Sequence, residues 1–376
     1  MKEQGSYLST AEQERRYAGL RAIMRESGCS DAIVVGPAQV GGKRYFRYFT
    51  DWNLQSFGGY LHVGIDTAPA AVFRAWSQAY WSRRVGWVKD IVSERDPLAV
   101  VLARVAAASA AGHIGVIGTE YLSVTDHGRL QAELGDRLVD LTSQVDDLTS
   151  VKSPEEQQML RNAGAVFDRA WSAVLAEARP GISEWDLAAV AGRELLAQGV
   201  SHSIILIGAS APGSPAACVG WPRDRRIGID EAVQMSIEGP APSGYCVEIG
   251  GTFTFGPAPS QLARQFEVQL RGMRAGVGRL IDGRTSGDVA EAVDHAFREG
   301  GCHTGYPGMH GIGYGIPEPP PIERDNARKL VVGNVIAMHP NAVSADGVGT
   351  LTSRTYVVGA ADAECLSQLP MQLAEL

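Results

Sequence analysis

The sequence is poor in cysteine. Its 376 residues include five cysteines, and no CxxC pair occurs. An odd number of widely scattered cysteines suits free thiols in a reducing compartment. The polar N-terminal stretch lacks the apolar core of a secretion signal, and no later run approaches the length of a membrane span. We therefore expect a cytoplasmic protein.

An excess of positive charge is also absent. Lys and Arg number 34 against 42 Asp and Glu, which gives a net charge of -8. Phosphate backbones and anionic membranes attract proteins with the opposite imbalance, so we expect no nucleic acid and no membrane among the partners. Apolar residues make up 45% and charged residues 20%, which is ordinary for a globular protein. Wholesale disorder is therefore not expected.

The length of the chain exceeds what one hydrophobic core usually supports, and it predicts two domains. Residues 10–28 place apolar side chains among charges at helical spacing, and a short buried strand, DAIVVG, follows. Further apolar runs at residues 60–65, 70–73 and 114–117 are separated by helical stretches, which is typical of an α/β layer. We assign residues 1–145 to this first domain.

A second domain is predicted for residues 150–376. It begins with a capping box, in which Ser153 precedes Pro154 and Glu156 follows at the third helical position. The segment GISEWDLA at residues 181–188 is echoed by GRTSGDVA at residues 283–290, and both read as helix starts. The repeat suggests two related α/β halves, with a site between them.

Several short motifs of the second domain resemble those of the creatinase, aminopeptidase P and methionine aminopeptidase superfamily, peptidase M24. They are VKSPEE at 151–156, GY at 244–245, MHGIG at 309–313, GNVIAMHP at 333–340 and TYVV at 355–358. The resemblance implies an α/β (α+β) fold, with a small N-terminal creatinase-like domain followed by a C-terminal pita-bread domain of internal two-fold pseudo-symmetry.

Peptidases of this family bind two divalent ions through two aspartates, one histidine and two glutamates. The resemblance places Ile237, Glu248, His310, His339 and Ser353 at those five positions. One carboxylate thus remains of four. Two divalent cations beside a single carboxylate would leave several positive charges uncompensated in a partly buried pocket. We therefore expect no dinuclear metallopeptidase and no cofactor.

The same positions leave a set of two histidines and one carboxylate. Glu248, His310 and His339 could hold a single Fe, Zn or Mn ion. Without a metal, His310 and His339 could act as general acid and base, with Glu248 orienting a histidine or a cationic substrate group. The alternative is that these residues have structural roles only, with the two histidines hydrogen-bonded in the core and Glu248 paired with Arg354.

Further residues are candidates for substrate binding. Glu238 follows the lost aspartate, Tyr245 could donate a hydrogen bond, and Ser353 and Arg354 replace acidic neighbours. Creatinase carries its principal histidine near residues 217–221, where this chain offers only Cys218 and the more distant His202. The alternatives are packing roles for Tyr245 and for the cysteine.

In the first domain, YFTDW at 48–52 and FG at 57–58 resemble a loop that completes the site of a partner subunit. Tyr48 and Phe57 are the substrate-contact candidates there, and the resemblance implies a homodimer. Creatinase has an arginine where this chain has Gly59, so creatine is not the expected substrate.

Three functions follow from the resemblance. The first is a metal-independent creatinase-like enzyme that hydrolyses or rearranges a C–N bond of a small polar substrate, with a biosynthetic cyclase or lyase step as a variant. The second is a non-catalytic pseudo-peptidase that binds a partner. The third is a mononuclear metal enzyme.

Overall fold

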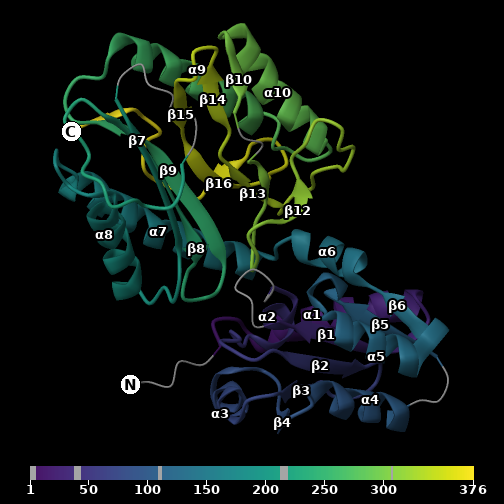
Figure 1. Cartoon of the computed structure of the whole chain (residues 1–376). Helices are drawn as coiled ribbons and strands as arrows, with labels where there is room; N and C mark the ends of the chain where they lie inside the picture. The colour runs from purple at the N-terminus through teal and green to yellow at the C-terminus, as the bar shows by residue number, and fades with distance from the viewer. Residues whose placement is uncertain (1–5, 38–43, 109–111, 212–218, 306–307) are drawn as a thin grey trace. The chain divides into compact units, whose positions relative to one another are not determined.

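The computed structural model describes residues 6–37, 44–108, 112–211, 219–305 and 308–376. The chain divides into two compact units, residues 1–149 and 150–376 (Figure 1). Among the described residues, no helix is both long enough and apolar enough to cross a bilayer. Each unit is a mixed α/β structure, which confirms the fold class predicted from the sequence.

The described part of the first unit contains a six-stranded sheet in the order β4-β3-β2-β1-β5-β6. The strands are β1 (Cys29–Gly36), β2 (Gly59–Gly64), β3 (Ala70–Phe73), β4 (Asp90–Ser93), β5 (His113–Ile117) and β6 (Leu138–Asp140). Antiparallel pairing joins β1 to β2 and β2 to β3, whereas β1–β5, β5–β6 and β3–β4 are parallel. The apolar runs recognised in the sequence therefore become the strands of this sheet.

Helices pack around that sheet. They are α1 (Thr10–Glu26), α2 (Arg44–Thr50), α3 (Trp76–Val85), α4 (Pro97–Ala108), α5 (Val124–Leu134) and α6 (Thr142–Ser150), with 3-10 turns η2 (Thr119–Tyr121) and η3 (Gly135–Arg137). Ser9 caps α1 by accepting a hydrogen bond from the Glu12 amide. Aliphatic residues of α4 and α5 share a buried core with β1 and β5.

The second unit begins with α7 (Pro154–Glu177) and α8 (Glu184–Ala197), and a second helix pair follows, α9 (Ser260–Val277) and α10 (Ser286–Glu299). The Ser153–Glu156 capping box is present. The two echoed segments both start helices, α8 after Ser183 and α10 after Thr285. Each hydroxyl accepts a hydrogen bond from the amide three residues on, which is why the same short pattern recurs at both places.

The larger sheet of this unit runs β12-β11-β13-β16-β9-β8-β7, with β17 beside β16 and β18 beside β9. Its strands are β7 (Ile204–Ser210), β8 (Ala232–Pro240), β9 (Cys246–Thr254), β11 (His310–Gly311), β12 (Glu318–Pro321), β13 (Val335–Met338), β16 (Ser353–Val357), β17 (Glu364–Cys365) and β18 (Ala374–Glu375). A smaller sheet contains β10 (Cys302–Thr304), β14 (Asn341–Ser344) and β15 (Gly349–Leu351). Figure 1 shows β8 and β9 as long neighbouring ribbons beside α7 and α8.

The β8–β9 hairpin sets which side chains share a face. Its register runs without interruption and pairs Glu238 with Glu248 and Ile237 with Ile249. Because successive side chains of a strand point to opposite faces, the two glutamates lie on one side and the two isoleucines on the other. The turn between Pro240 and Cys246 is closed by a hydrogen bond from the Ala241 amide to the Tyr245 carbonyl, 2.9 Å long.

Candidate functional site

Three titratable side chains meet on one face of the larger sheet. Glu248 comes from β9, His310 begins β11, and His339 follows β13 directly. The Glu248 carboxylate bridges the rings, with Oε1 3.4 Å from His310 Nε2 and Oε2 3.4 Å from His339 Nε2. The two Nε2 atoms are 3.2 Å apart. We call this group the acid–histidine cluster.

Strand pairing explains why these residues converge. His310 pairs with Ala337, and Ala337 pairs with Thr355, so these three positions share a face. His339, two residues beyond Ala337, returns to that same face. The Glu248 amide donates to Thr355 Oγ1 at 2.9 Å, and Ser353 Oγ donates to Glu248 Oε2 at 3.3 Å. The carboxylate is therefore held by β16 as well as by its own strand.

The protonation of His310 follows from its contacts. Its Nδ1 lies 2.8 Å from the Gly311 carbonyl oxygen, which can only accept, so Nδ1 carries a hydrogen. Burial works against a charged ring, but the Glu248 carboxylate outweighs it and raises the pKa of His310. A proton on Nε2 then points toward Glu248 and His339. His310 thus stays protonated to higher pH than an ordinary histidine, because its raised pKa favours the cationic ring.

The other two members take the opposite protonation states. Burial lowers the pKa of His339, and neither the nearby Glu248 carboxylate nor its backbone contact restores it. Burial also opposes ionisation of Glu248, but the two histidine rings beside it and the hydrogen bond from Ser353 keep its pKa below the usual value. The cluster therefore combines a carboxylate, an imidazolium and a neutral imidazole.

Glu238 is the second carboxyl group of the site. It stands opposite Glu248 in the hairpin register. Burial and the charge of Glu248 together raise the pKa of Glu238 to about 8. Two acids on one face thus have different states at neutral pH, because Glu238 retains its proton while Glu248 is ionised. Pairs of titratable groups with pKa values driven apart are typical of acid/base sites.

A cavity of about 240 Å³ adjoins the cluster, and Glu238 and His339 both line it. A substrate in this cavity would meet a protonated carboxyl and a neutral imidazole. Glu248 is only 3% exposed and lies behind them. The arrangement can supply a proton and accept one within the same cavity.

Arg354 does not belong to this cluster, although the sequence suggested it as a substrate contact or a partner of Glu248. It follows Ser353 on β16, so its side chain emerges on the opposite face. The guanidinium donates to the carbonyl oxygens of Gly250, Ser353 and Pro370 at 2.8, 2.7 and 3.1 Å. Burial lowers the pKa of Arg354. Its contacts are with the backbone, away from the histidines.

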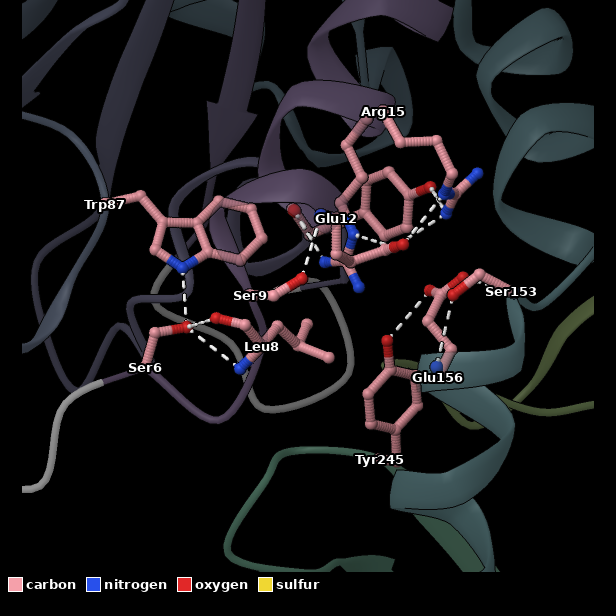
Figure 2. A network of polar contacts seen from close by, with 11 residues as sticks. Ser6, Leu8, Ser9, Glu12, Arg15, Trp87, Ser153, Glu156 and Tyr245 are labelled. Atoms are coloured by element: carbon pink, nitrogen blue, oxygen red, sulfur yellow. Dashed lines mark hydrogen bonds and ion pairs between the residues drawn. The ribbon is translucent and has the colours of Figure 1, made fainter.

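Two other candidates, Tyr245 and His202, lie apart from the cluster, and the structure does not describe a third, Cys218. Tyr245 is fully buried and stacks on Tyr314. Its hydroxyl donates a 2.8 Å hydrogen bond to Glu156 (Figure 2), which favours the packing alternative. His202 lies before β7, where its Nδ1 is 3.0 Å from Ser201 Oγ. Cys218 lies outside the described residues.

The two candidates of the first unit differ from each other. Tyr48 belongs to helix α2 rather than to a loop and is 2% exposed. The Arg16 guanidinium lies over its ring, 4.1 Å from the centroid. Phe57 is 59% exposed and has a positive φ of 52°. A role for either residue in a partner's site, and the homodimer itself, stay predictions.

The donor set of the cluster fits one metal ion and not two. One ligand atom from each of Glu248, His310 and His339 lies within 4.8 Å of the others. A second ion would need acids at Ile237 and Ser353, which offer an aliphatic chain and a neutral hydroxyl. Ile237 is fully buried and paired with Ile249 on the other face. A dinuclear centre is therefore not supported by these residues.

The sequence reasoning missed the polar residues of the cavity beyond the cluster. Gln234 and Ser236 line it together with Glu238, and Asn341 faces them from β14. A signal was present in the alternation of polar and apolar residues along 234–238, which is typical of a strand with one polar face. No comparable local signal marks Asn341.

Comparison with known proteins places these features in a family context. The model of metallopeptidase family M24 matches residues 158–362. A probable dipeptidase PepE of Mycobacterium tuberculosis is 30% identical over 199 residues, which cover 51% of this chain and 52% of the relative. An uncharacterized peptidase YqhT of Bacillus subtilis is 30% identical over 207 residues, 54% of this chain and 58% of the relative. The chain spans about half the length of these curated relatives.

Solved structures resemble the whole chain. An Xaa-Pro dipeptidase from Bacillus anthracis has a TM-score of 0.83 and 18% identity, covering 97% of this chain and 100% of that one. Dipeptidase PepE from Mycobacterium ulcerans has a TM-score of 0.81 and 24% identity, covering 98% and 99%. At this level of identity the likeness establishes the fold.

Proposed function

The chain belongs to metallopeptidase family M24, and from that premise we propose that it is a hydrolase of C–N bonds whose acid–histidine cluster replaces the two-metal centre. The substrate is a small polar molecule. Glu238 and His339 carry out proton transfer, and His310 and Glu248 set the charge around them. Its relatives bear the names of dipeptidases and peptidases, which supports hydrolysis as the reaction class.

The observation that carries this proposal is the charge of the site. Glu248 is the one ionised carboxylate of the cluster, and the His310 imidazolium already compensates it. Adding two dications would place about four positive charges beside a single anion, at a cost of several kcal/mol per ion even after relaxation. The same residues require no metal to hold and move protons. Side-chain acid/base chemistry therefore fits this cluster better than two-metal chemistry.

The proposed reaction assigns one proton transfer to each cavity group. Water attacks the carbon of the scissile C–N bond, and neutral His339 accepts the proton that the water loses. The electron pair of the breaking bond goes to nitrogen, which takes a proton from Glu238. The proton on His339 then returns to Glu238 through solvent, which restores both groups. His310 stays protonated and, with Glu248, holds the electrostatic environment constant.

Replacement of one histidine tests the proposal. We expect His339→Ala, which removes the group that accepts the proton of water, to lower turnover of a panel of dipeptides, amides and ureido compounds by roughly 100-fold or more, the range typical of lost acid/base catalysis. His295, whose side chain is 64% exposed on α10, provides the matched control as His295→Ala. Circular dichroism and thermal unfolding check that both variants fold. Activity retained by folded His339→Ala, or activity abolished by a chelator, would refute the metal-independent mechanism.

A single-metal enzyme is the second candidate, because the three ligand atoms of the cluster lie within 4.8 Å of one another. Bound there, an Fe, Zn or Mn ion would supply Lewis acidity, while Glu238 would still line the cavity as a proton donor. Elemental analysis of protein purified without chelator separates the candidates. One ion per chain that is lost in His339→Ala supports this candidate, and two ions per chain would contradict both.

A further inference from the structure

A buried ion pair lies beside the turn that follows His310. Lys152 precedes the capping box of α7, and its Nζ is 2.9 Å from Oε2 of Glu318, the first residue of β12. The two side chains are 3% and 5% exposed, and neither residue is among the described residues that line the cavity. The loss of hydration offsets most of the attraction in such a pair, so its net contribution to stability is small. Its importance therefore depends on what it orders.

Residues 311–317, which we call the histidine turn, fold around the Glu318 carboxylate. Oε1 accepts a 2.7 Å hydrogen bond from the Gly315 amide, and Oε2 accepts from Lys152 Nζ. Gly313 passes so close to the pair that an added Cβ would lie 2.4 Å from Glu318 Oε2 and 2.7 Å from Lys152 Nζ. Both carboxylate oxygens are thus bound at the turn, and the ammonium group supplies the opposite charge.

The histidine turn begins with the residue that orients His310. Gly311 pairs with Glu318 across β11 and β12, and its carbonyl oxygen accepts from His310 Nδ1 at 2.8 Å. A Cβ added at Gly311 would lie 2.3 Å from the Pro319 carbonyl oxygen, so the two strands are in close contact at this point. Displacement of Glu318 would therefore move the carbonyl group that holds the His310 ring.

The histidine turn also contacts the strand that carries Glu248. In the larger sheet, β13 and β16 lie between β11 and β9. The Gly313 carbonyl oxygen nevertheless accepts a 2.7 Å hydrogen bond from the amide of Cys246, the first residue of β9. The Ile312 amide donates to the Val335 carbonyl oxygen of β13 at 3.0 Å. The turn is therefore bound to both strands that place the other two members of the acid–histidine cluster.

The backbone of Lys152 is held independently of its side chain. Its amide donates to the Gly333 carbonyl oxygen at 2.9 Å, and its own carbonyl oxygen accepts from Gln157 Nε2 at 2.9 Å. Neither bond involves the ammonium group. A substitution at this position can therefore remove the charge while the chain around it stays attached to α7 and to the segment before β13.

We propose that Lys152 is a positioning residue, which through its ion pair with Glu318 fixes the histidine turn and so the orientation of the His310 ring toward Glu248. The inference rests on the proposed function only where turnover is measured, because the contact of the ring can be followed directly. It deepens that function by naming a residue outside the cavity on which the geometry of the acid–histidine cluster depends.

Substitution of Lys152 tests the proposal. Lys152→Met removes the charge and keeps an unbranched side chain. NMR of isotopically labelled protein follows exchange of the His310 Nδ1 proton with water, and the signal is assigned with His310→Gln. We expect exchange roughly tenfold or more faster than in the wild type, because the contact with the Gly311 carbonyl oxygen opens more often. His62, whose ring is bonded to Asp31 in the first unit, serves as an unchanged reference.

A matched control separates positioning from stability. Glu184 is another fully buried carboxylate of the second unit, and it is paired with Arg223 at the start of α8. Glu184→Gln should lower the melting temperature, as Lys152→Met does, but should leave the His310 exchange rate within about twofold of the wild type. Unchanged His310 exchange in folded Lys152→Met would overturn the proposal, and so would an equal acceleration in Glu184→Gln.

A double variant keeps the test decisive if Lys152→Met does not fold. Combining it with Glu318→Gln leaves no uncompensated charge, so the melting temperature should recover relative to Lys152→Met. The ion pair is still lost, and His310 exchange should therefore stay fast. Wild-type exchange in the folded double variant would refute the role of the pair.

Kinetics distinguish this inference from the proposed function. If the wild type is active, kcat should fall about tenfold in folded Lys152→Met while KM stays within about twofold, because the pair affects the geometry of the cluster and does not line the cavity. Faster exchange with unchanged kcat would remove His310 from the mechanism and support its positioning by Lys152. A wild type that hydrolyses nothing in the panel would remove the proposed hydrolase, and the exchange rates would still decide the positioning.

Discussion

Replacing Glu248 with glutamine should lower the pKa of His310. In the wild type, burial disfavours the protonated ring, and contact with Glu248 reverses that effect. At 3.4 Å and an effective dielectric constant near 20, the attraction between the two charges is at most about 5 kcal/mol. One pKa unit corresponds to about 1.4 kcal/mol, so the upper limit is a fall of roughly three and a half units. We expect a fall of at least about one unit after the site relaxes.

Histidine ring C–H signals followed by NMR between pH 4.5 and 9 measure this change. The spectrum of His310→Gln assigns the His310 signal among the eight histidines of the chain, and the exposed His295 ring serves as an internal reference. Glu248→Gln keeps the shape of the side chain, so the comparison isolates its charge.

The same shift has a consequence for stability. A raised pKa means that protonation of His310 favours the folded state below the ordinary pKa of histidine, and this contribution is lost as the pH rises through the folded value. Glu248→Gln should remove that part of the pH dependence from the free energy of unfolding. A His310 signal that titrates at the same pH in both proteins would refute the assignment of its charge to Glu248.

Two further changes test the surroundings of the site. Because the pKa of Glu238 is raised to about 8, the wild type loses stability as the pH rises toward that value and a buried carboxylate forms. The melting temperature of Glu238→Gln should therefore exceed that of the wild type by more at pH 9 than at pH 5. An equal difference at both pH values would count against the raised pKa. A Cβ added at Gly272 on α9 would lie 2.1 Å from Phe297 Cε1 on α10, so Gly272→Ala should lower the free energy of unfolding in urea by about 1–3 kcal/mol. A Cβ added at Gly128 on α5 meets no atom within 4 Å, so Gly128→Ala should instead raise the free energy of unfolding by roughly 0.5–1 kcal/mol. Destabilisation by both variants would point to an effect on the helix backbone rather than on packing.

The residues of the cluster could be proposed from the sequence because each one lies within a short motif. Glu248 follows the GY of the hairpin, His310 lies in MHGIG, and His339 precedes Pro340. Local motifs of this kind identify ligand positions without a knowledge of the fold. They do not give the protonation states, which arise from burial and from contacts between segments far apart in the chain.

Other features depended on geometry that spacing does not reveal. The family resemblance places Ile237 at a ligand position, whereas the hairpin register places Glu238 opposite Glu248. The position of Arg354 next to Ser353 in the sequence suggests that it reaches the site, whereas alternation along β16 directs its side chain to the other face. Tyr48 was assigned to a loop, although the aromatic run around it forms helix α2.

The uninterrupted ladder between β8 and β9 restricts how this region can change over evolutionary time. An insertion of one residue within either strand would interrupt this ladder with a bulge or shift its register. A shift by one residue would turn one of the two glutamates away from the face that both occupy and bring an isoleucine onto it. Length changes within the strands are therefore coupled to loss of the site, whereas the bend between Pro240 and Cys246 can vary in length without moving either glutamate.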